Sequence, residues 1–327
     1  MSTSDVTGLS TAVAARADSR EPRLLHAAGV DLRLEGCMLR TAQLADEYFV
    51  ATPEPTPLLE ALHDCGRRID LLTIVQALHA TQPDACVAQM PGARLSWDPL
   101  AVLPLSSYAH WFEHQLTFKP RNRLRKSARC GIRTGPVDFD DAFVRAIQAI
   151  YDESPLRQGK ANRHYGKSLA TLRREHATFM DRSEFVGAWL GAELVGFAKV
   201  THCGPSSIVM NMVAKLAHRD KSPTNALLAQ VVERSAARGS QLLNYGIWGR
   251  RGLNEFKVAN GFVRLDVPRW HLPLSAAGRC ALALGLQRRW AERLPEAWIV
   301  RLADARAAWN TWRMQRLHPG ANAPHEA

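Results

Sequence analysis

The sequence lacks the features that mark several classes of protein. No apolar run approaches the ~20 residues that a membrane-spanning helix requires, and the best run, 280–286, lies between arginines. The six cysteines are spread singly, without a C-x-x-C pair, so neither a disulfide framework nor a metal site is expected. Residues 1–20 have no basic start followed by an apolar core, which argues against an export signal. We therefore expect a cytoplasmic protein that does not span a membrane.

Two common catalytic motifs are also missing. Gly166-Lys167-Ser168 lacks the glycine five residues earlier that a phosphate-binding P-loop needs. No G-x-S-x-G nucleophile elbow occurs either, and no period of 20 to 50 residues recurs. The sequence thus argues against a P-loop ATPase, a serine hydrolase of the elbow type, and a solenoid or propeller.

The overall composition is that of a folded protein with a cationic surface. The chain has 327 residues, of which 46% are hydrophobic and 22% charged, and this length suits two domains. The formal net charge is +11, which favours an anionic partner such as a phosphorylated cofactor, RNA or an acidic lipid headgroup.

A basic segment marks the expected domain boundary. Residues 119–133 contain seven Lys or Arg and no acidic residue, whereas residues 24–110 alternate helix-like stretches such as 57–63 with strand-like runs such as 69–75. A helix would gather basic side chains of this segment on one face. This anion-binding face consists of Arg121, Arg123, Arg125, Lys126 and Arg129. It either grips a nucleotide, tRNA or lipid-linked phosphate, or is a solvated interdomain helix.

The region after the basic segment predicts a helix over 140–153 and then an antiparallel meander. Residues 185–190 and 194–201 are rich in strand formers and are joined by a short glycine-containing turn. Residues 206–214 supply a third strand. The sheet should therefore continue through three neighbouring strands.

A capped helix follows the third strand. Ser222 is expected as its N-cap with Pro223 at the first helical position, and Gly239 as its left-handed C-terminal cap. Residues 241–245 then return to the sheet. Such a unit places helix N–H groups beside a sheet edge, which favours anion binding.

This order of elements is accompanied by three sequence segments, 122–126 (NRLRK), 186–198 (VGAWLGAELVGFA) and 256–262 (FKVANGF). Together they resemble the FemAB-like branch of the GNAT superfamily over about 155 residues. The resemblance implies an α/β (α+β) fold with a mixed central sheet and flanking helices, preceded by a smaller, degenerate GNAT-like half. The expected organisation is a flexible tail at 1–23, the degenerate half at 24–118, the acyltransferase domain at 119–275 and a helical extension at 276–327.

The resemblance also implies the reaction. The donor is acyl-CoA or acetyl-CoA in most of the superfamily and aminoacyl-tRNA in the FemAB peptidoglycan enzymes, and the acceptor is an amine on a small molecule or precursor. The usual pyrophosphate loop has the form [QR]-x-x-G-x-[GA], but residues 218–225 contain no glycine. Either the donor phosphates bind to this loop and the first turn of the following helix, or the loop is a turn whose charges only face water. The residues concerned are Arg219, Lys221, Ser222, Thr224 and Asn225.

Two residues are candidates for chemistry. Lys257 stands at the FemAB-like "FK" position, where a lysine stabilises the oxyanion of the tetrahedral intermediate, unless it merely pairs with Glu255 or a phosphate. Tyr245 is either a proton donor to the leaving group or a core tyrosine. Asp152 and Glu153 are weaker candidates for a base.

The C-terminal extension is basic and rich in tryptophan, so it either packs on the catalytic domain or lies on an anionic membrane at its inner face. We predict a cytoplasmic acyltransferase that uses acyl-CoA. The alternatives are an aminoacyl-tRNA-dependent transferase, a non-catalytic RNA-binding protein, and an envelope assembly factor whose site is vestigial. The sequence predicts no oligomeric state.

Overall fold

The computed structural model describes residues 23–45, 47, 53–78, 82–157, 160–249 and 253–286. The predicted N-terminal tail, except Arg23, and the tryptophan-rich part of the C-terminal extension lie outside these residues. The described residues form two compact units, one of residues up to 99 together with 266–286, the other of residues 100–265. No helix of the described residues is long and apolar enough to cross a membrane.

The unit boundaries fall earlier than residues 119 and 276, where composition places them. Each boundary lies inside a long strand, β5 (Arg94–Pro104) or β13 (Val263–Pro273), and composition does not change there. Residues 100–118 join the second unit through a buried anchor, because Trp111 of the π-helix η1 (Trp111–Gln115) donates its Nε1–H to the Asn260 carbonyl at 2.9 Å.

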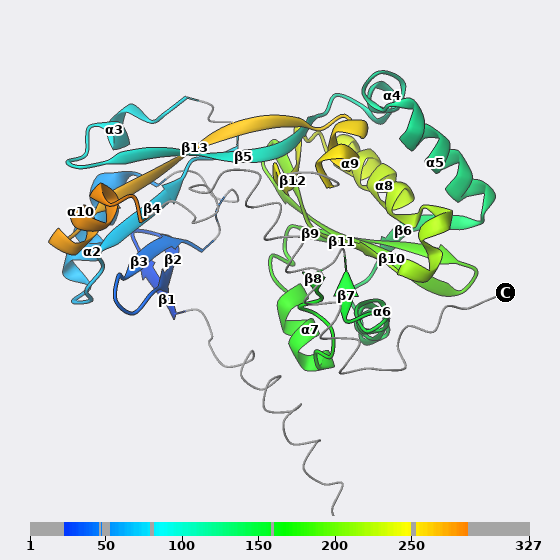
Figure 1. Ribbon diagram of the computed structural model, residues 1–327, viewed down its shortest axis with the longest axis horizontal. Helices are drawn as coiled ribbons and strands as arrows, with labels where there is room; N and C mark the ends of the chain where they lie inside the picture. Colours follow the sequence, from blue (N-terminus) through cyan, green and yellow to red (C-terminus); the bar gives the residue numbers. More distant parts are fainter. Residues whose placement is uncertain are drawn as a thin grey trace, which may run out of the picture. The chain divides into compact units, whose positions relative to one another are not determined.

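The first unit is a small sheet with helices (Figure 1). Its strands run in the order β1 (Arg23–Ala27), β2 (Val30–Glu35), β3 (Thr41–Leu44), β4 (Leu71–Val75) and β13, and only the β3–β4 pair is parallel. The helices are α2 (Pro55–Asp64), α3 (Ala85–Ala88) and α10 (Ala276–Ala283). The apolar strand β4 is buried throughout, and α2 begins at a proline and buries Leu58 and Leu62. The helix and strand predicted within 57–75 are confirmed.

The second unit has a larger mixed sheet. Its order is β5, β12 (Leu242–Ile247), β11 (Ser206–Ala214), β10 (Glu193–Cys203), β9 (Ser183–Leu190) and β6 (Ile132–Val137), and its single parallel pair is β11–β12. The predicted hairpin and third strand are confirmed as β9, β10 and β11. A short hairpin of β7 (Leu156–Arg157) and β8 (Lys160–Ala161) stands apart from this sheet.

Helices cover both faces of this sheet (Figure 1). On one face lie α8 (Pro223–Ala237), whose Leu227, Leu228, Val231 and Val232 enter the core, and α5 (Phe118–Arg129), which packs on α8. On the other face α6 (Asp141–Tyr151) and α7 (Leu169–His176) pack on Phe185 and Phe197. The predicted mixed sheet with flanking helices is therefore confirmed. The remaining helices are α4 (Tyr108–His110), the 3-10 helix η2 (Leu216–Lys221) and α9 (Leu253–Ala259).

Candidate active site

The parallel strands β11 and β12 pair only at their beginnings. Their register covers three positions, from Ser206↔Leu242 to Ile208↔Asn244, although β11 continues to Ala214 and β12 to Ile247. The carboxyl ends of two parallel strands lie at the same edge of a sheet, so the strands separate at the edge where α8 begins. Ligands of α/β sheets bind at such positions. Of the sequence-predicted residues, Tyr245 lies in β12 and Ser222 lies at the start of α8.

Lys257 lies in α9 and is only 1% exposed. Its Nζ donates to the Ile247 carbonyl, at the end of β12, at 2.7 Å, and lies 5.1 Å from the centre of the Tyr245 ring. Burial lowers the pKa of Lys257 to about 8. The alternative of a pair with Glu255 is wrong, since Lys257 makes no ion pair with any described residue. A buried ammonium without a carboxylate is costly, which marks the position as a site of function.

Tyr245 occupies β12 one residue beyond the last pair with β11. Its ring packs against Phe256 and Phe262, and burial raises the pKa of its hydroxyl. The phenol therefore remains protonated at neutral pH, and its O–H makes no hydrogen bond to a described residue. Both predicted roles of Tyr245, proton donor and core tyrosine, stay open.

The β11–α8 loop has a left-handed backbone at the position where the pyrophosphate-loop pattern has its first glycine, although this chain has a serine there. Counted from Arg219, the pattern [QR]-x-x-G-x-[GA] places Ser222 at the first glycine, and Ser222 is left-handed with φ 59° and ψ 42°. A residue other than glycine is strained there. Ser222 is the N-cap residue of α8, as predicted, and Pro223 follows it, but the Ser222 hydroxyl makes no capping hydrogen bond. Instead the Ser222 carbonyl accepts from the N–H groups of Asn225 and Ala226 at 3.1 and 3.4 Å.

Glu153 is a structural clamp on this loop and no free base. Its carboxylate accepts from the N–H groups of Leu216 and Ala217 at 2.6 and 2.8 Å and pairs with Arg157 at 3.2 Å. Arg157 also donates to the Ala214 carbonyl at 2.8 Å. Sequence reasoning missed this role, because Glu153 and Arg157 are close to each other in the sequence whereas the backbone that they bind is some sixty residues away.

Two buried amides lie near the point where the strands separate. Asn225 is in the first turn of α8, and Asn244 is the last residue of β12 that pairs with β11. Both are buried, and neither Nδ2 of Asn225 nor Oδ1 of Asn244 has a partner among the described residues. Buried polar atoms are almost always satisfied, so an open donor and an open acceptor here indicate ligand contacts. Asn225 was predicted, whereas Asn244 carries no signal in the sequence.

The predicted basic face divides into two parts. Arg121 is committed to its own segment, since it donates to the Leu116 carbonyl at 3.0 and 2.7 Å and to the Glu113 carbonyl at 3.2 Å. Pro120 and Ser127 are buried, while the remaining basic side chains point to solvent. The exposed set is Arg123, Arg125, Lys126 and Arg129. Because α5 contacts both η2 and α8, these charges lie on the helix next to the donor loop.

One further polar cluster has the appearance of a hydrolytic triad. His202 links Ser207 at 2.8 Å to Glu184 at 3.1 Å, and the Ser207 hydroxyl also bonds to Ser240 at 2.5 Å. The Ser207 hydroxyl is already bonded to both His202 and Ser240, so it is committed to partners within the protein. We assign this cluster to stability, together with Arg234, which pairs with Glu184.

No protein-family model matches the sequence, and no curated protein matches it. Solved structures do resemble the fold. They include FemX, with a TM-score of 0.58 and 9% identity over 79% of this chain and 86% of that chain. The C-terminal domain of a protein described as a lysylphosphatidylglycerol synthetase from Agrobacterium fabrum gives 0.55 and 12% over 80% and 87%.

A third such structure, L-PGS from Bacillus licheniformis, has a TM-score of 0.54 and 13% identity over 82% of this chain and 90% of that chain. At these identities the likeness concerns the fold. The chain shares the fold of these structures, in agreement with the mixed sheet and flanking helices that its resemblance to the FemAB-like branch implies.

Proposed function

We propose that the protein is an aminoacyltransferase that takes its donor group from aminoacyl-tRNA and passes it to an amine. This replaces acyl-CoA, the donor favoured from sequence, with the alternative. One observation supports the proposal most strongly. Most backbone N–H groups of the β11–α8 loop already donate hydrogen bonds within the protein, and the helix next to the loop carries exposed cations.

A coenzyme A pyrophosphate requires several open N–H groups in this loop. Here Glu153 occupies those of Leu216 and Ala217, and the Ser222 carbonyl occupies two more in α8. Pro223 has none. Thr224 is the one residue of the first helical turn whose N–H has no partner in the described part of the chain. The loop is thus poorly suited to cradle a diphosphate.

The neighbouring helix suits a longer anion. Five exposed basic side chains of α5, Lys119 and the four named above, and the exposed Arg219 face solvent without an acidic residue in the helix. A polynucleotide backbone binds through many dispersed phosphate contacts of this kind. One of the similar structures is described as a lysylphosphatidylglycerol synthetase, a name that joins an amino acid to its acceptor. The dispersed cations favour tRNA over a small nucleotide, and the name of the similar protein favours an aminoacyl group over an acetyl group.

The chemistry is aminolysis of an ester. The acceptor nitrogen attacks the ester carbonyl carbon, a C–N bond forms, and the C–O bond to the ribose breaks. The Lys257 ammonium stabilises the intermediate oxyanion, and does so strongly because its surroundings are shielded from water. Its bond to Ile247 uses one of three N–H groups. Tyr245, protonated at neutral pH, gives its proton to the leaving ribose oxygen and regains one from solvent, while the amine loses one proton to solvent.

The test measures binding of bulk tRNA on filters between 50 and 300 mM salt. The double variant Arg123→Ala/Lys126→Ala should lower the slope of log K against log salt by about 1.5, since each phosphate contact contributes about 0.7 to 0.9. The matched control Arg145→Ala/Arg173→Ala removes two charges from α6 and α7 and should leave the slope unchanged. Stabilisation by acetyl-CoA, with tRNA binding equal in all three proteins, would refute the proposal.

A further inference from the structure

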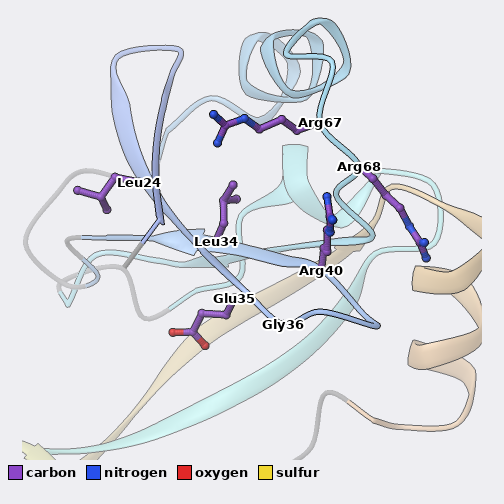
Figure 2. Close-up of a pocket in the computed structure, with 7 residues that line it drawn as sticks. All are labelled: Leu24, Leu34, Glu35, Gly36, Arg40, Arg67 and Arg68. Carbon is purple, nitrogen blue, oxygen red and sulfur yellow. The ribbon is translucent and has the colours of Figure 1, made fainter. Parts of the chain in front are cut away.

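A concave site on the first unit plays no part in the proposed transfer. Its volume is about 480 Å³, and it is lined by two leucines, Glu35, Gly36 and three arginines, Arg40, Arg67 and Arg68. Figure 2 shows Arg40 and Arg67 extending from different segments towards the space above Leu34, while the Glu35 carboxylate points away from them. The Arg40 and Arg67 side chains, from two segments, therefore border one cavity, whereas the Arg68 side chain extends away from Leu34 and is bound to Asp70.

A buried carboxylate holds the base of this cavity in place. Asp70 is 0% exposed and accepts from the Arg40 N–H at 3.0 Å, Arg68 Nε at 3.1 Å and the Ser275 hydroxyl at 2.6 Å. The Asp70 N–H in turn donates to the Arg40 carbonyl at 2.8 Å. The backbone of Arg40 and the side chain of Arg68 are thus fixed before any ligand arrives, which reduces the entropy lost on binding.

Two of the arginines keep their charge unneutralised. The guanidinium groups of Arg40 and Arg67 have no partner among the described residues, because Asp70 binds the backbone of Arg40 and not its side chain. The acidic lining residue Glu35 is itself engaged by Gln43 at 3.0 Å. Arginine forks match phosphate oxygens, so the cavity is suited to a phosphate group.

Exposed apolar side chains occur at the cavity and in the adjoining turn. Leu24 on β1 is 55% exposed and lines the cavity. Met38 is 87% exposed in the β2–β3 turn, between the lining residues Gly36 and Arg40 along the chain. This turn depends on Gly36, which has φ 83° and whose Cβ would lie 2.0 Å from the Leu39 carbonyl oxygen. Apolar side chains beside a phosphate-binding site suit a ligand whose phosphate is attached to hydrocarbon.

We propose that this arginine pocket binds the phosphate of an anionic lipid headgroup, with Leu24 and Met38 entering the adjoining edge of the bilayer. The first unit would thereby hold the protein at a membrane surface without a spanning helix. The inference does not depend on aminoacyl transfer and concerns other residues, so the two proposals stand or fall separately.

The test is co-sedimentation of the full chain with vesicles of phosphatidylcholine containing 30% phosphatidylglycerol, against vesicles of phosphatidylcholine alone. We expect Arg40→Ala/Arg67→Ala to weaken binding to the anionic vesicles about 25-fold, at about fivefold for each arginine. The control Arg94→Ala/Arg279→Ala removes two exposed arginines of the same unit outside the pocket and should change binding less than twofold. Arg68 is left intact because it bonds to Asp70.

A second pair of variants tests the lipid source of the phosphate. Met38→Ser should weaken vesicle binding about fourfold, the value of one buried methylene, whereas Met180→Ser in the second unit should not. Inorganic phosphate at 10 mM should compete only weakly with vesicles. Equal binding by the pocket variant and its control would overturn the proposal. So would binding of inorganic phosphate that needs Arg40 and Arg67 without any vesicle binding, because the pocket would then serve a soluble phosphate.

Discussion

Replacing Lys257 by methionine should stabilise the protein at neutral pH while greatly slowing transfer. Methionine keeps the length and apolar volume of the side chain and removes the ammonium. Burial lowers the pKa of Lys257 from 10.5 to about 8, and a shift of this size corresponds to about 3 kcal/mol of penalty at pH 7. The variant loses this penalty. It also leaves the Ile247 carbonyl without its Nζ donor, at a cost of about 1 to 2 kcal/mol. The net expectation is a gain of about 1 to 2 kcal/mol.

The pH dependence of the unfolding free energy independently checks the sign of this stability change. Below pH 8 both the folded and the unfolded chain hold the Lys257 proton, so the penalty is constant. Between pH 8 and 10.5 the unfolded chain holds a proton that the folded chain has released, so the stability of the wild type rises with pH. The variant lacks this rise. The difference between the two proteins should shrink by about 2 to 3 kcal/mol between pH 7 and 10 and reverse in sign.

The assay is urea unfolding followed by tryptophan fluorescence at pH 7, 8, 9 and 10. Lys199 has a similarly lowered pKa, but it is present in both proteins and its contribution cancels. Lys119→Met, which removes an exposed lysine, serves as the control and should show no pH-dependent difference. Transfer by Lys257→Met should fall about 100-fold, as for loss of one oxyanion donor. A variant destabilised by more than about 2 kcal/mol equally at every pH would show that Lys257 is an ordinary structural residue.

Three other changes test the account of the loop and the core. Glu153→Gln should destabilise by about 2 to 3 kcal/mol and lower donor affinity, since the Leu216 and Ala217 N–H groups and Arg157 lose a charged acceptor; urea unfolding and donor titration measure both. Ser222→Gly should relieve the left-handed strain and raise the unfolding free energy by about 0.5 to 1 kcal/mol, whereas Ser222→Ala should not. Burial tends to raise the pKa of Glu184, but hydrogen bonds from His202 and Arg234 bring it to about 2. Its stabilising contribution is therefore present above pH 4.5 and lost towards pH 2, and Glu184→Gln should remove about 3 kcal/mol at pH 7 but little at pH 2.5, measured by thermal unfolding.

The elements of the second unit were predictable because their signals are local. The apolar runs of β9, β10 and β11 are separated by short turns, and Pro223 and Gly239 stand at the two ends of α8, where Gly239 has φ 77°. Each element can therefore be located from a few neighbouring residues. The Phe-Lys pair of the FemAB-like pattern also identified Lys257 as a candidate residue before the fold was known.

The roles that sequence reasoning missed depend on distant partners. Glu153 binds backbone atoms of residues 216 and 217, and Asn244 matters because its acceptor is buried and open, which no local pattern reveals. Arg121 was grouped with the exposed arginines by helical spacing, but the carbonyl groups of the preceding π-helix hold its guanidinium. The unit boundaries were misplaced for a related reason, since a strand that passes from one unit to the next keeps the same composition.

The most direct test of the central claim is donor use. Purified protein would be incubated with tRNA charged with radiolabelled amino acids, or with labelled acetyl-CoA, in the presence of an extract of cellular amines and lipids, and alkali-stable label would be counted. Alkali hydrolyses the ester to tRNA but leaves an amide, so stable label reports transfer to an amine. The account predicts stable label from charged tRNA with the wild type, about 100-fold less with Lys257→Met, and none from acetyl-CoA. Stable label from acetyl-CoA, with charged tRNA left intact, would contradict it.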